Sequence, residues 1–149
     1  MILGVEVIQK NRIPDVRGTI QHGIRADELN HPFGEVYFKR LRIGIINGWH
    51  VHDSLKLNYI CVQGSLRLVL CDLRKSSPSY NEVNEIIMGT DNYVLVHIPP
   101  GVANATETLS HPDSLLCNIA SEPHNANIKY RRIDPNSKEI DFDWTRKNF

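Results

Sequence analysis

Residues 57–73, LNYICVQGSLRLVLCDL, decide the fold of this chain. Apolar residues recur at every second position on both sides of Gln63-Gly64: Leu57, Tyr59 and Cys61 before it, and Leu66, Leu68 and Leu70 after it. Successive side chains of a β-strand point to opposite faces, so each segment presents one apolar face. Glycine suits the tight turn between them. The stretch predicts a β-hairpin with one buried face.

Outside this stretch, turn residues recur every 8–12 positions or so, which is typical of an all-β sandwich or barrel. We expect further strands over 3–9, 19–24, 35–43, 83–88, 93–98, 102–109, 114–120 and 128–133, and a loop over 11–18. No helix is expected beyond a short turn near residues 26–29. About ten short strands predict a double-sheet jelly roll. The length of 149 residues predicts one domain, residues 1–149.

Charge and hydropathy exclude two classes of partner. The chain has 17 Lys and Arg against 17 Asp and Glu, with no basic run that would indicate nucleic-acid binding. No segment approaches the ~20 apolar residues of a membrane span. Cys61, Cys71 and Cys117 are odd in number and lie in apolar runs, so we interpret them as buried, reduced thiols. Together these features predict a cytoplasmic protein.

The candidate site is residues 48–56, GWHVHDSLK. On a strand, His50 and His52 point the same way, roughly 7 Å apart along the chain. Lys56 follows after a short break. Three interpretations are open: a metal site, an acid/base site with its own cation, or polar side chains that face solvent.

The residue types argue against the metal site. The third ligand position falls on Lys56, whose ammonium group repels a cation, and the fourth falls on Asn104, whose amide is a weak ligand. We therefore expect neither a metal nor another cofactor. A neutral histidine is a suitable base for removing a proton beside a ketone, and Lys56 could stabilise the enolate oxygen. One such donor contributes ~3 kcal/mol to a transition state.

Several motifs occur together in one order: Asp15-Val-Arg17-Gly18, Asn47-Gly-Trp-His50, Asp72-Leu-Arg74-x-x-Ser77-Pro78 and Ile98-Pro99-x-Gly101. In this combination the chain resembles the dTDP-4-dehydrorhamnose 3,5-epimerase family of metal-independent cupins, from residue 13 to residue 144. The resemblance implies a cupin barrel (a double-stranded β-helix, or jelly roll). It also implies a homodimer that acts on a nucleoside-diphosphate 4-keto-6-deoxyhexose.

The resemblance also implies residue roles. His50 falls on the family's base and Lys56 on the lysine that contacts the ketone and enolate oxygen. The family more often has another residue at position 52, and we expect His52 to assist His50. Arg17 falls on an arginine that contacts the nucleotide diphosphate, often across the dimer. The alternative interpretation of Arg17 is a surface charge on a loop.

Three residues depart from the family pattern, and we assign them to the substrate-binding surface. Asn47 replaces an arginine, Asn104 replaces a histidine, and Cys117 aligns with the tyrosine that acts as the opposite acid. Loss of this tyrosine leaves two alternatives to an epimerase. The His50-x-His52 pair is similar to nucleotide-sugar 3,4-ketoisomerases, and the chain could instead be a non-catalytic nucleotide-sugar-binding cupin.

Overall fold

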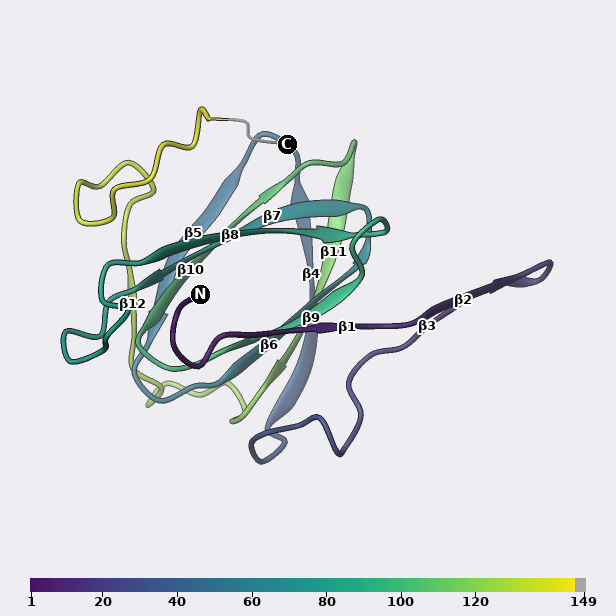
Figure 1. Ribbon diagram of the computed structural model, residues 1–149, viewed down its shortest axis with the longest axis horizontal. Coiled ribbons are helices and arrows are strands. Elements are labelled where there is room, and N and C mark those ends of the chain that lie inside the picture. Colours follow the sequence, from purple (N-terminus) through teal and green to yellow (C-terminus); the bar gives the residue numbers. More distant parts are fainter. Residues whose placement is uncertain (147–149) are drawn as a thin grey trace.

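The computed structural model describes residues 1–146, and all regular secondary structure in that range is β-strand. One five-stranded sheet has the order β1 (Glu6–Gln9), β9 (Val94–Ile98), β6 (Leu57–Gln63), β11 (Asp113–Ala120) and β4 (Glu35–Arg42). We call it the first sheet. The second sheet has the order β12 (Tyr130–Arg132), β5 (Ile46–His52), β10 (Val102–Thr108), β7 (Ser65–Asp72) and β8 (Val83–Gly89). The two sheets enclose the core (Figure 1), which confirms the predicted jelly roll.

The stretch 57–73 forms the two expected strands, but the predicted hairpin pairing is wrong. β6 pairs with β9 and β11 in the first sheet, whereas β7 pairs with β8 and β10 in the second. Gly64, with φ of +75°, makes the corner where the chain crosses between sheets. Both apolar faces meet in one core cluster, with Leu66, Leu68 and Leu70 fully buried. Alternation therefore identified the buried faces, and these faces lie opposite each other across the interior.

The predicted loop over 11–18 contains a strand instead. β2 (Arg12–Asp15) pairs antiparallel with β3 (Gly18–Gln21), and this arm projects away from the two sheets (Figure 1). Its apolar side chains are exposed, including Ile20 and, at the tip, a completely exposed Val16. Since neither face of the arm is buried within the chain, its sequence lacks the alternation that marks a half-buried strand. Near residues 26–29 the chain makes a turn and no helix.

The end of the described chain covers the outer face of the second sheet. Phe142 and Trp144 of the tail pack against Trp49 of β5, with ring centroids 6.2 and 5.5 Å from it. Trp49 is completely buried there. The tail therefore supports β5 from behind, on the face opposite the candidate site.

The three cysteines are buried free thiols, as predicted from their apolar surroundings. Residues 1–146 contain no helix long and apolar enough to cross a membrane. The cytoplasmic location stays a prediction.

Candidate active site

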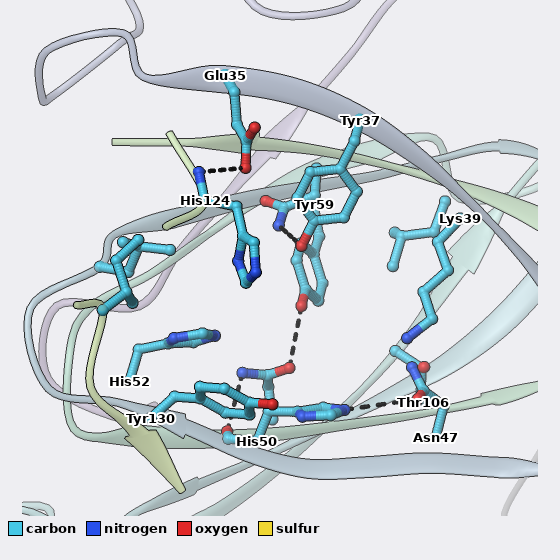
Figure 2. Close-up of a pocket in the computed structure, with 15 residues that line it drawn as sticks. Glu35, Tyr37, Lys39, Asn47, His50, His52, Tyr59, Thr106, His124 and Tyr130 are labelled. Carbon is cyan, nitrogen blue, oxygen red and sulfur yellow. Dashed lines mark hydrogen bonds between the residues drawn. The ribbon is translucent and has the colours of Figure 1, made fainter. Parts of the chain in front are cut away.

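A cavity of about 180 Å³ opens between the two sheets (Figure 2). The first sheet lines it with Glu35, Tyr37, Lys39, Tyr59, Leu116 and Asn118. The second sheet lines it with Asn47, His50, His52, Asn104, Thr106 and Tyr130, and Leu55, His124 and Ile128 complete the wall. A ligand in this cavity would have one sheet on each side.

The strand β5 presents three polar side chains to the cavity because it contains a bulge. Asn104 pairs with His50, but Thr106, two residues on, pairs with Asn47, so β5 has one extra residue here. Gly48 occupies the bulge with φ of +146°, and a Cβ there would lie 2.5 Å from the Cβ of Ala105. A bulge re-aims neighbouring side chains. This one brings Asn47 onto the same wall as His50.

His50 is a neutral imidazole at physiological pH. Burial, reinforced by the positive charges of Lys39 and Arg132, lowers the pKa of His50 to about 4. Its Nε2 lies 3.5 Å from Oδ1 of Asn47. An amide oxygen can only accept a hydrogen bond, so Nε2 carries the proton and Nδ1 keeps the lone pair. This contact favours the tautomer in which Nδ1 of His50 is available as a base.

Polar atoms of the cavity wall lack protein partners. Nδ1 of His52, Oγ1 of Thr106 and Oδ1 of Asn118 are buried and make no hydrogen bond within residues 1–146. A buried polar group without a partner costs roughly 1–3 kcal/mol. All three belong to residues that line the cavity, so its walls carry polar side chains from both sheets.

The two predicted partners of His50 differ in position. His52 lies beside it on β5, and the ring of Tyr130 covers both, with centroids 6.4 Å from His50 and 5.5 Å from His52. Lys56 is exposed outside the cavity, and its Nζ lies 3.5 Å from the carbonyl oxygen of Asn30. The predicted pairing of Lys56 with His50 is therefore not found. The turn at residues 53–56 directs Lys56 away from the cavity wall.

Lys39 of β4 supplies a cation to the cavity in place of Lys56 (Figure 2). Burial, together with the charge of Arg132, lowers the pKa of its ammonium group. Sequence reasoning missed Lys39, although a signal was present: Glu35, Tyr37 and Lys39 recur at every second position of one strand. That spacing marks one polar face of the strand, opposite the face that carries the exposed apolar side chains of Val36 and Phe38.

Cys117 does not line the cavity, which corrects its predicted place opposite His50. It packs on the outer face of the first sheet with Ile60, Tyr93 and Ile119. Its neighbour Asn118 faces the cavity, because adjacent residues of a strand point to opposite faces. Burial raises the pKa of the Cys117 thiol, so it stays protonated.

The two other residues that we assigned to substrate binding occupy different parts of the molecule. Asn104 lines the cavity, where it accepts a hydrogen bond from the Tyr59 hydroxyl at 3.0 Å and donates one to the carbonyl oxygen of His50. Arg17 lies at the tip of the arm, highly exposed and paired with Asp15 at 2.5 Å. Within one chain, the structure does not bring Arg17 to the cavity.

In residues 1–146, no three His, Cys, Asp or Glu side chains lie close enough together to hold a metal ion. The cavity instead combines a neutral histidine, a nearby cation and hydroxyl groups on both walls. Groups of these kinds can move protons on a polar ligand. Two antiparallel sheets stacked around such a cavity define a protein of the cupin class.

The comparisons identify the family. The whole chain, residues 1–149, matches the family described as dTDP-4-dehydrorhamnose 3,5-epimerase, and the chain belongs to this family of isomerases. It is 30% identical over 147 residues to the spore coat polysaccharide biosynthesis protein SpsL of Bacillus subtilis, with 97% of each chain covered.

Two further proteins are similar to this chain. A probable low-salt glycan biosynthesis epimerase of Haloferax volcanii is 25% identical over 144 residues, covering 93% of this chain and 87% of that one. The crystal structure of a dTDP sugar isomerase from Desulfovibrio desulfuricans superposes with a TM-score of 0.92 at 26% identity, covering 99% of this chain and 94% of the other.

Proposed function

We propose that this protein epimerises a dTDP-4-keto-6-deoxyhexose, or a similar nucleoside-diphosphate 4-keto sugar, at a carbon next to the ketone. The observation that carries the proposal is that His50 on the second sheet faces Lys39 on the first, in one cavity lined by polar side chains of both sheets. A sugar ring offers hydroxyl and carbonyl groups to such side chains, and a ketone makes the neighbouring C–H acidic enough for a histidine base.

In this mechanism Nδ1 of His50 takes the proton from the carbon beside the ketone. The electron pair of the broken C–H bond moves to the ketone oxygen and gives an enolate. Lys39 stabilises this negative charge, the role that the resemblance implies for Lys56. The ring of Tyr130 lies beside both histidine rings, and we propose that His52 assists His50. As the enolate forms, its charge favours the protonated imidazole and so raises the basicity of His50.

We further propose that the chain is one domain that acts as a homodimer, with Arg17 of one protomer binding the diphosphate in the partner's site. A two-stranded hairpin is at best marginally stable in water without packing partners. The arm nevertheless exposes Val16 and Ile20, and the outer face of β4 exposes Phe33, just before the strand, and Phe38. A second copy of the chain that covers these surfaces would bury the apolar side chains of both the arm and the outer face of β4.

The relatives suggest the pathway. SpsL takes part in spore coat polysaccharide biosynthesis and the Haloferax volcanii protein in glycan biosynthesis. We propose that the product here likewise supplies a cytoplasmic route to a surface polysaccharide.

The test is proton exchange in D₂O with dTDP-4-keto-6-deoxyglucose, followed by NMR at C3 and C5. We expect deuterium uptake by the wild type, a loss of at least ~100-fold for His50→Asn, and retained dTDP binding in that variant. Lys39→Met should lose ~100-fold because the enolate loses its cation. The matched control, Lys56→Met, should exchange at nearly the wild-type rate. No uptake with this or related nucleotide sugars would leave a non-catalytic nucleotide-sugar-binding protein as the alternative.

A 3,4-ketoisomerase is the second candidate, favoured by the placement of His50 and His52 on the same wall. Two bases on one face could move a proton between neighbouring carbons. The product decides between the two reactions: an epimerase leaves the ketone at C4, whereas a ketoisomerase moves it to C3.

A further inference from the structure

Epimerisation needs a proton donor on the ring face opposite the base, and the expected donor position, Cys117, lies outside the cavity. We infer that the Tyr37 hydroxyl on β4, held by Asn118, is this donor and protonates the enolate carbon from the first sheet. This inference rests on the proposed epimerase function. It assigns a catalytic role to a residue on a different strand from the one that the family alignment indicates.

The strand register places Tyr37 on the correct wall. Tyr37, Asn118 and Tyr59 pair across β4, β11 and β6 and form one row that faces the cavity. His50 lies on the second sheet, on the opposite side of the cavity (Figure 2). A sugar ring bound between the sheets would therefore present one face to His50 and the other to Tyr37.

The hydrogen bonding of Tyr37 leaves its own proton free. The amide Nδ2 of Asn118 donates to the Tyr37 hydroxyl oxygen at 2.8 Å. Since that oxygen acts as the acceptor, its O–H can point to the ligand. Asn118 is almost completely buried, so it fixes the tyrosine oxygen in place.

The other hydroxyls of the cavity are less suitable. The hydroxyl of Tyr59 already donates its proton to Asn104, and burial raises its pKa far above the usual range. Tyr130 covers the two histidines from β12 and so lies on the side of the base. His124 lines the cavity from an exposed loop and is the rival that the experiment must test.

The proton balance is complete without another reagent. His50 takes the proton of the breaking C–H bond, and the electron pair passes to the ketone oxygen. The enolate pair then forms a new C–H bond with the Tyr37 proton and restores the ketone. Water returns a proton to the tyrosinate and removes one from the imidazolium. The net change is inversion at one carbon.

The test compares exchange with inversion in D₂O for Tyr37→Phe. We expect His50 to keep exchanging the proton, within about tenfold of the wild type, while inversion falls by at least ~100-fold. The recovered substrate would carry deuterium with its original configuration. Asn118→Leu should lower the ratio of inversion to exchange in the same direction, which a merely structural role would not do. Because Tyr37 is 44% exposed, its replacement should leave the fold and dTDP binding intact.

Matched controls are Tyr130→Phe and His124→Gln, which should both still invert the carbon. If Tyr37→Phe inverted the carbon at the wild-type rate, the assignment would be overturned. It would also be overturned if His124→Gln lost inversion while Tyr37→Phe kept it. Absence of both exchange and inversion in the wild type would instead overturn the proposed function. The two failures are thus distinguishable.

Discussion

His50, the proposed base, has no carboxylate partner within residues 1–146, and its neighbours Lys39 and Arg132 are positive. Burial and the charges of Lys39 and Arg132 keep its imidazole neutral well below physiological pH. A neutral ring is ready to accept a proton, but the same charges disfavour the imidazolium that results. The proposed substrate would offset this effect, because its diphosphate and the developing enolate are negative. On this proposal, the base becomes stronger when the ligand is bound.

The pH dependence of kcat/KM tests this description of His50. A base must be deprotonated in the free enzyme, and a histidine with pKa of about 4 stays deprotonated down to that pH. We expect kcat/KM for proton exchange to be nearly constant from about pH 8 to pH 5 and to fall about tenfold per unit below pH 4. An ordinary histidine would lose activity already below about pH 6.5.

The control for this profile is Lys39→Met. Removing the positive charge should move the acidic limb to higher pH, because the protonated His50 is then less disfavoured. An unchanged limb in this variant, or a wild-type limb near pH 6.5, would contradict the proposed environment of His50.

Two structural elements, the bulge in β5 and the tail, determine the shape of the cavity wall. The bulge in β5 aims Asn47 and His50 at the ligand, and the tail supports the strand from behind through Trp49. Beside them, the carboxylate of Asp72 accepts hydrogen bonds from Arg74, Ser77 and Ser79. These bonds outweigh the effect of burial and hold the pKa of Asp72 well below its usual range. The Asp72-Leu-Arg74 motif therefore stabilises a loop.

Gly48→Ala tests the bulge. A Cβ at residue 48 would lie 2.5 Å from the Cβ of Ala105 and 2.9 Å from the carbonyl oxygen of Asn104, and its φ of +146° disfavours any side chain. We expect the free energy of unfolding in urea to fall by about 2–4 kcal/mol. Gly23→Ala is the matched control, because nothing lies within 4 Å of a Cβ there. Its effect should stay within about 0.5 kcal/mol. Equal effects of the two substitutions would refute this role of Gly48.

For the whole molecule, the projecting arm is the feature that one chain does not explain. Its tip carries Arg17 far into solvent, while the cavity of the same chain draws its cations from Lys39 and, beside His50, Arg132. A homodimer in which the arm reaches the partner would complete the site with a diphosphate-binding arginine. The site would then exist only in the assembly.

Complementation between two inactive variants tests this arrangement. Arg17→Ala and His50→Asn are each expected to exchange poorly. In a mixed dimer, the intact His50 of one protomer would meet the intact Arg17 of the other. Random mixing makes half of the dimers mixed, each with one complete site, so about a quarter of the wild-type activity should return. If Arg17 acted within its own chain, mixing would restore nothing.

The sequence by itself determined what depends on one strand at a time. The period of two identified the buried faces of residues 57–73 and the common wall of His50 and His52. Tertiary structure decided which strands lie opposite each other. It separated β6 from β7, turned Cys117 outward and set Lys39 and Tyr37 across from His50. The physical reason is that alternation fixes which residues share a face of their own strand. Which other face meets it depends on how the two sheets stack.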